Sequence, residues 1–201
     1  MMLALTAPVC TGQTAPSFDQ LYAQGQAANK GLRTLTAHFV ETTSNALLRA
    51  DRPIVARGLL FVERPSRVTL QYTDPPDQRI VIDGRWMTTS ARGVSRKLDI
   101  GASQDRVQKY FVQSDAGELR RVFEIELRDR STRPGTREVV MLPKRKPIKE
   151  ALSKLELWVG DDNGLLKAMR MTFANGDTKL MEFDNIVPNA PIDPTVFTVS
   201  P

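Results

Sequence analysis

Hydrophobic and polar residues alternate from residue 58 to residue 76, a pattern that predicts two half-buried β-strands. Pro65 lies between them, and because proline has no backbone N–H, the break belongs at a strand edge or corner. Arg64 has the same parity as the apolar positions, so a permanent cation is expected on the hydrophobic side of the sheet. The apolar positions of the two strands are Gly58, Leu60 and Val62, then Val68, Leu70 and Tyr72.

The same alternation predicts further strands before and after this pair. One strand is expected around residues 35–40, followed by a long exposed connection over 42–53. Residues 79–83 and 85–89 flank Asp83-Gly84, a dipeptide typical of a type I′ hairpin, and residues 94–98 follow another turn at 90–93. Six strands with short loops and no crossover helices indicate an antiparallel meander.

The second half of the chain repeats the pattern after a helical interruption. Strands are expected at residues 123–127, 138–142, 155–159, 165–173 and 179–184, for a total of about eleven. Asp161 and Asp162 belong to the polar turn between two of them, since the ligand spacing of a calcium loop is absent. The proline-rich end, 188–201, is expected to pack as an irregular strap.

Helical spacing occurs in two places. Ser17 and Gln20 form a capping box, which predicts an amphipathic helix over about residues 18–30 with a narrow apolar stripe. Between 103 and 121 the apolar residues again recur at helical spacing, interrupted at 115–117, so two short helices are expected there.

The first sixteen residues look unlike a folded segment. Residues 1–9 are apolar and small, which favours the remnant of a secretory signal, with a disordered start as the alternative. Cys10 suggests lipidation, but Pro8 and Val9 fit that signal badly, so an unlipidated export product is preferred. Residues 17–201 are then expected to form a single domain.

The chain is basic, with a net charge of +5 and a pI near 9.6, which favours an anionic partner. The strongest charge run is Pro143-Lys-Arg-Lys-Pro147. It has no interleaved aromatic residues, so a nucleic-acid partner is not expected. A solvated loop is the favoured interpretation, and docking to an anionic membrane surface is the alternative.

The sequence offers little material for catalysis. The only histidine, His38, has the parity of the outer face, and no glycine-rich phosphate loop is present. With Cys10 discounted, nucleophilic and metal-binding sets cannot be assembled, so neither catalytic nor metal-binding residues nor a cofactor is expected. The 23 acidic residues leave acid–base pairs open, although none interrupts an apolar run that would raise its pKa.

Several ordered fragments carry a family resemblance. They are Leu35-Thr-Ala-His-Phe39, the run from Gly58 to Pro65, Val68 to Tyr72, Asp74-Pro75, Ile82-Asp83-Gly84, Asn175-Gly-Asp-Thr178, Phe183-Asp-Asn185, Asn189, Ile192-Asp193 and Phe197. Together they resemble the periplasmic outer-membrane lipoprotein carrier family, the LolA-like proteins. The resemblance implies an α+β, mostly β fold: a strongly curved antiparallel sheet of about eleven strands, an incomplete barrel with helices covering its mouth.

The resemblance also implies a function. A periplasmic carrier of this kind shields the acyl chains of a lipoprotein, or of a related amphiphile, and delivers it toward the outer membrane. Its partners would be an inner-membrane exporter and an outer-membrane acceptor, and the carrier would be a monomer. A lipid-binding sensor module and a cofactor-free enzyme on the same fold are the alternatives.

Nine residues are candidates for the lining of a lipid cavity, although each also suits a filled core. The likeness further implies that Arg64 hydrogen-bonds to the covering helices and holds the empty carrier shut, whereas the pattern alone fits an exposed edge residue equally well. The candidate lining consists of Leu35, Phe39, Leu60, Val62, Val68, Leu70, Tyr72, Ile82 and Trp86.

Overall fold

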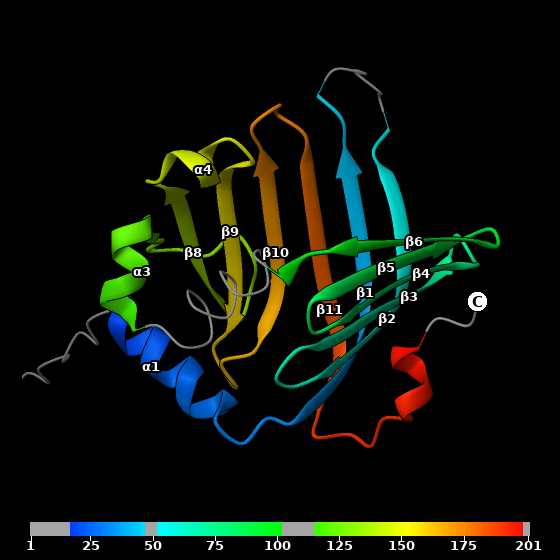
Figure 1. The fold of residues 1–201 in the computed structure, drawn as a ribbon. Coiled ribbons are helices and arrows are strands. Elements are labelled where there is room, and N and C mark those ends of the chain that lie inside the picture. Colours follow the sequence, from blue (N-terminus) through cyan, green and yellow to red (C-terminus); the bar gives the residue numbers. More distant parts are fainter. Residues whose placement is uncertain (1–16, 47–51, 102–114, 199–201) are drawn as a thin grey trace, which may run out of the picture.

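The computed structural model describes residues 17–46, 52–101 and 115–198, and these ranges form one antiparallel sheet of eleven strands. The strand order is β6-β5-β4-β3-β2-β1-β11-β10-β9-β8-β7, so the sheet is not closed (Figure 1). This confirms the incomplete barrel and its number of strands. The predicted signal remnant at residues 1–16 lies outside the described residues.

The first meander follows the predicted order. Its strands are β1 (Thr34–Ser44), β2 (Ile54–Glu63), β3 (Arg67–Asp74), β4 (Gln78–Asp83), β5 (Trp86–Ala91) and β6 (Val94–Asp99). The start of the expected exposed connection is instead strand, because β1 continues to Ser44. The backbone of Thr42 there pairs with both β2 and β11, so main-chain pairing rather than hydrophobicity extends the strand.

The second meander contains the other five strands. They are β7 (Phe123–Leu127), β8 (Thr136–Pro143), β9 (Leu152–Gly160), β10 (Leu166–Phe173) and β11 (Thr178–Pro188). The two meanders join where β1 pairs with β11, with Phe39 opposite Phe183. Figure 1 shows the result: β3 to β6 turn across the front of the sheet, which gives it a concave side.

Helices lie at the concave side and at one end of the sheet. They are α1 (Phe18–Asn29), α3 (Ala116–Val122) and the short α4 (Lys146–Lys149). The 3₁₀ helix η2 (Pro194–Phe197) lies instead on the convex side, where the Thr69 hydroxyl donates to the Val196 carbonyl oxygen at 2.9 Å. The capping box of α1 is present, with the Ser17 hydroxyl accepting from the Gln20 backbone. Of the two short helices expected in 103–121, the second is α3, capped by Asp115, and the first falls in residues outside those described.

Two local expectations were wrong. The hairpin after β4 has Gly84 and Arg85 at its centre, and only Gly84 has a positive φ, 54°. Glycine at the first central position fits a type II′ turn, not type I′. The basic run does not remain a loop, because Lys146–Lys149 forms the single turn of α4, with Pro147 near its start, where a missing N–H costs nothing.

The concave face is filled unevenly by two hydrophobic clusters. One joins Leu21 of α1 and Leu119 of α3 to the inner faces of β7, β8 and β9. The other consists of Phe39, Ala56, Tyr72 and Met181, with half-buried neighbours around it. Between the two clusters, the side chains of the sheet and of α1 leave a cavity, and the candidate site lies there.

Gly58 makes the second cluster possible. An added Cβ would lie 2.7 Å from the Phe39 ring and 2.2 Å from the Gln71 carbonyl oxygen. The Phe39 ring therefore occupies the space that any side chain at residue 58 would need. It meets the Tyr72 ring edge-on at 5.1 Å between centroids, a favourable aromatic geometry.

Replacing this glycine tests the packing. Gly58→Ala should lower the free energy of unfolding by about 1–3 kcal/mol, since the methyl group must displace backbone or an aromatic ring. Gly31→Ala is the matched control: no atom lies within 4 Å of its added Cβ, so its effect should stay below about 0.5 kcal/mol. Urea unfolding measures both, and equal stabilities would contradict the packing described.

Candidate functional site

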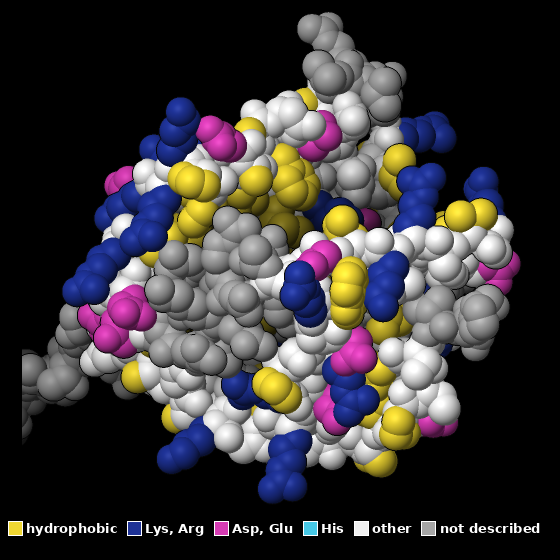
Figure 2. All heavy atoms as spheres, viewed as in Figure 1, with side chains coloured by type: hydrophobic (Ala, Val, Ile, Leu, Met, Phe, Trp, Pro, Cys, Tyr) yellow, Lys and Arg dark blue, Asp and Glu magenta, His cyan; other side chains and the backbone are white. Residues whose placement is uncertain are grey.

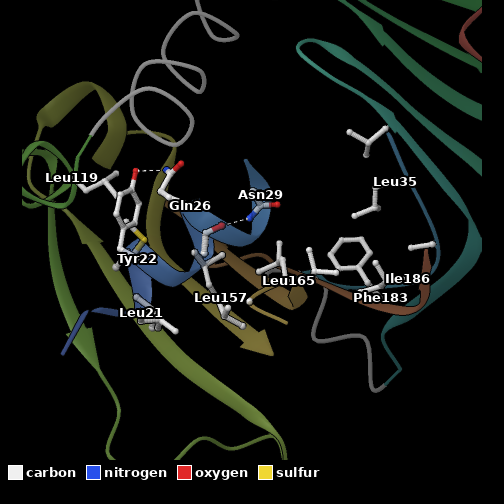
Figure 3. Close-up of a pocket in the computed structure, with 18 of the residues that line it drawn as sticks. Leu21, Tyr22, Gln26, Asn29, Leu35, Leu119, Leu157, Leu165, Phe183 and Ile186 are labelled. Atoms are coloured by element: carbon white, nitrogen blue, oxygen red, sulfur yellow. Dashed lines mark hydrogen bonds between the residues drawn. The ribbon is translucent and has the colours of Figure 1, made fainter. Parts of the chain in front are cut away.

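A cavity of about 430 Å³ lies between α1 and the concave face of the sheet. Its walls are mainly hydrophobic. Figure 3 shows Leu21, Tyr22 and Leu157 on one side, and Leu35, Phe183 and Ile186 on the other. Figure 2 shows hydrophobic side chains gathered in a hollow in front of β9 and β10.

The cavity draws its lining from both meanders and both core-covering helices. The described lining residues are Phe18, Leu21, Tyr22, Gly25, Gln26 and Asn29 of α1; Leu35 and Ala37 of β1; Leu60, Val62 and Arg64 on and after β2; Leu119 of α3; Val139, Met141, Leu157 and Val159 of β8 and β9; and Gly164, Leu165, Leu166, Phe183 and Ile186. Since its volume falls within the range of small-molecule pockets, the cavity can hold an apolar ligand.

Three of the nine residues expected to line a cavity meet there: Leu35, Leu60 and Val62. Val68 and Ile82 pair in the same row of the sheet as Val62, and are half buried, but lie beyond the cavity. Apart from Trp86, the candidates therefore share the concave face, although the cavity occupies only part of it.

Four other candidates lie elsewhere. Phe39 and Tyr72 are 1% and 5% exposed and belong to the second cluster, against which Leu70 packs. Trp86 does not share their face at all. Trp86 pairs with Asp83, whereas the neighbouring pair of Ile82 and Met87 has side chains on the concave face. Because successive side chains of a strand point to opposite faces, Trp86 lies on the convex side, where it is 41% exposed. Lys97 lies 4.5 Å from its ring centroid.

Sequence reasoning missed the contribution of α1 and of the second meander. The stripe at Phe18, Leu21 and Gly25 marked an inward face of the helix, and the alternation at 155–159 marked one of β9. Neither pattern says which strands the helix faces. That information comes only from the tertiary packing of Leu21 against β7, β8 and β9.

Arg64 stands at the end of the cavity, directly after β2. Its guanidinium Nη1 donates to the Asn29 carbonyl oxygen at 2.8 Å, at the C-terminal end of α1. The last carbonyls of a helix have no partner within it and carry partial negative charge, so an arginine is favourable there. The Arg64 backbone N–H also donates to the Arg33 carbonyl oxygen at 2.9 Å, which fixes the residue next to β1.

Helix α1 thus connects the two sides of the cavity. Leu21 anchors it in the cluster against β7 to β9, and Asp19 pairs with Arg120 of α3 at 2.5 Å. The turn before β10 also lies close to α1, since a Cβ added at Gly164 would be 3.5 Å from the Gly25 Cα. From the opposite side, Arg64 holds the end of the helix.

A polar group lies on the concave face beyond Phe39. The Glu41 carboxylate accepts from the Tyr72 hydroxyl at 3.0 Å and from Lys179 Nζ at 2.9 Å. Burial, followed by the charge and the hydrogen bond of Glu41, raises the pKa of Tyr72 well above its ordinary value. The three side chains come from β3, β1 and β11, so they tie the two meanders together.

Other chemistry is sparse in the described ranges. No group of three or more His, Cys, Asp or Glu residues there is arranged to hold a metal ion. His38 is exposed on the outer side, 3.5 Å from Asp184. Across these same ranges, the helices are too short or too polar to cross a membrane.

An open, curved antiparallel sheet that holds an apolar cavity against a helix has the architecture of a protein that binds apolar ligands. Comparison with known families identifies the particular one. The chain belongs to the outer membrane lipoprotein carrier protein LolA family, whose model matches residues 30–200. The family is named for a carrier, not for an enzyme.

Individual proteins are also similar to this chain in sequence or in fold. The outer-membrane lipoprotein carrier protein of Chromobacterium violaceum is 28% identical over 198 residues, 97% of this chain and 90% of the relative. The solved lipoprotein LppX of Mycobacterium tuberculosis has a TM-score of 0.54 at 14% identity, covering 88% of this chain and 99% of that one. The Pseudomonas aeruginosa MucA/MucB complex has a TM-score of 0.55 at 15% identity, covering 90% of this chain but 60% of that one. These structures share the fold.

The Tyr72 hydrogen bond can be tested directly. Tyr72→Phe should lower the free energy of unfolding by about 1–3 kcal/mol at neutral pH, because it removes a donor from a buried carboxylate. The stabilisation due to the raised pKa is complete below the ordinary phenol value of about 10 and is lost as pH rises toward the folded-state value. The stability of the variant should therefore decline less above pH 10 than that of the wild type.

Tyr22→Phe is the control, since the Tyr22 hydroxyl accepts a hydrogen bond from the exposed Gln26 amide at 2.8 Å. Urea unfolding between pH 7 and pH 11 measures all three proteins. Parallel pH profiles for the wild type and Tyr72→Phe would show that Tyr72 does not contribute in this way.

Proposed function

We propose that this protein is a periplasmic carrier that shields acyl chains of a lipoprotein, or of a related amphiphile, and delivers its cargo toward the outer membrane. The observation that carries the proposal is the 430 Å³ hydrophobic cavity between α1 and the sheet. Membership of the lipoprotein carrier family supports it.

The size of the cavity suits an acyl chain. A cavity of about 150 Å³ holds benzene, so 430 Å³ corresponds to roughly seventeen carbon atoms on the same scale. Moving a methylene group from water into an apolar environment is favourable by about 0.8 kcal/mol, which gives on the order of 10 kcal/mol for a sixteen-carbon chain. An apolar cavity of this volume supplies the main part of that free energy.

Arg64 acts as the latch of the empty carrier in this proposal. Swinging α1 away from the first meander requires breaking the hydrogen bond from Arg64 to the Asn29 carbonyl oxygen. A bond from a charged donor contributes about 1.5–3 kcal/mol, which opposes cargo binding by the same amount. The cargo is then held less tightly than its hydrophobicity alone would give, so transfer to an acceptor stays feasible.

The remaining expectations complete the proposal. Residues 17–201 act as one lipoprotein-carrier domain and work as a monomer. An inner-membrane exporter loads the cargo and an outer-membrane acceptor receives it. Native mass spectrometry of protein purified from a periplasmic extract tests the proposal, which requires a bound mass equal to that of an acylated species.

Filling the cavity should abolish binding. Ala37 lies in its wall and is 3% exposed, so Ala37→Phe places a ring where the ligand would lie. We expect the affinity for a fluorescent sixteen-carbon fatty acid to fall at least tenfold. His38→Phe, the next residue of β1 and exposed on the opposite face, is the control and should bind as the wild type does. Unchanged binding by Ala37→Phe would move the ligand out of this cavity.

Breaking the latch should have the opposite effect. Arg64→Leu is expected to raise acyl-probe affinity about tenfold or more, because opening no longer costs a charge-assisted hydrogen bond. Arg33→Leu removes an equal charge at a neighbouring exposed position and should leave affinity near that of the wild type. Probe titration, together with the lipid retained in purified protein, measures the effect, and equal retention in both variants would rule out the latch.

A further inference from the structure

A group of cations at the ends of β8 and α3 lies next to the cavity and takes no part in it. We call it the basic face: Arg121, Lys144, Arg145, Lys146 and Lys149, all exposed. Within residues 144–149 there are four cations and no acidic residue. Glu118 in α3 and Glu150 after α4 are the nearest acidic residues on these elements.

Much of the basic face is not neutralised by the protein. Most arginines that lie on the sheet pair with carboxylates, such as Arg67 with Glu63 and Arg137 with Asp161. In contrast, Arg121, Lys146 and Lys149 form no ion pair with any residue in the described ranges. Their charge is therefore available to an external partner.

The fold holds the basic face in a fixed place. Ile148 of α4 packs against the first hydrophobic cluster, so the lysines on either side of it point outward. Lys144 donates from its Nζ to the Arg120 carbonyl oxygen at 2.8 Å, and from its backbone N–H to the Val122 carbonyl oxygen at 2.7 Å. The basic face is thus attached to α3.

This attachment connects the basic face to the cavity, because Leu119 of the same short helix lines it. Figure 2 shows Lys and Arg side chains along the edge formed by α3 and α4, beside the hollow with hydrophobic walls. A flat surface that binds through the basic face would therefore lie close to the place where an acyl chain enters or leaves.

We propose that the basic face docks the carrier on an anionic phospholipid surface. Clustered lysines and arginines bind such surfaces through charge and need no shaped groove. The proposal rests on the carrier function, since it assigns the basic face to the membrane from which, or to which, acyl chains move. A shaped acidic protein is the competing partner.

Vesicle sedimentation with the full chain tests it. Wild-type protein should bind vesicles of about 30% phosphatidylglycerol in phosphatidylcholine and should not bind vesicles of pure phosphatidylcholine. About 0.5 M NaCl should release the bound protein, because salt screens exposed charges. Lys146→Gln/Lys149→Gln should bind roughly 30-fold more weakly, since each lysine contributes about 1 kcal/mol and 1.4 kcal/mol is tenfold.

The matched control is Arg96→Gln/Lys97→Gln, which removes two exposed cations from β6, the opposite edge strand of the sheet. It should bind phosphatidylglycerol vesicles within about threefold of the wild type if the basic face is the docking site. Equal losses in the two double variants would mean that only net charge matters and would overturn the proposal.

Two further readouts separate the possible failures. Both double variants should bind the sixteen-carbon probe as the wild type does; if no protein binds it, the carrier function fails independently of docking. The wild type could fail to bind phosphatidylglycerol vesicles yet bind immobilised poly-glutamate, with that binding lost in Lys146→Gln/Lys149→Gln. The basic face would then recognise an acidic protein, and the membrane proposal would be wrong.

Discussion

The pairing of β1 with β11 is the interaction on which the rest of the structure depends. It joins two meanders whose other strands pair only with neighbours in sequence, and it brings residues 34–44 beside residues 178–188. Such a pairing closes a long loop, an entropic cost that local contacts do not share. The buried Phe39 opposite Phe183, and the network of Glu41 with Tyr72 and Lys179, help to offset that cost.

The same junction creates the site. Because a single sheet runs through both meanders, its twist turns the outer strands toward one another and leaves a concave apolar face. The two hydrophobic clusters occupy opposite parts of this face, and the cavity lies between them under α1. A hollow of this kind forfeits some packing energy, which is the expected cost of keeping space for a ligand.

The electrostatic groups divide into two kinds. Glu41 is almost fully buried and has both carboxylate oxygens satisfied, so it acts in holding the sheet together. Arg64 and the basic face are exposed, and Arg64 holds a helix by one hydrogen bond that a moderate free energy can break. Arg64 lies at the end of the cavity, and the basic face is attached to α3, whose Leu119 lines the same cavity.

The sequence by itself determined the eleven strands, the capped first helix and the Arg-Pro break that places Arg64 at a strand end. These features depend on alternation, capping and the missing N–H of proline, which are local properties of the chain. Only the tertiary structure decided which apolar residues line a cavity and which fill a core. Leu35 and Phe39 have the same parity on β1, yet one faces the space under α1 and the other packs on Gly58. Trp86 shows the same limit in another form, since the turn at Gly84 and Arg85 sets the register of β5 and thereby its face. Periodicity specifies a direction, whereas the distance to the opposite wall depends on residues remote in the chain.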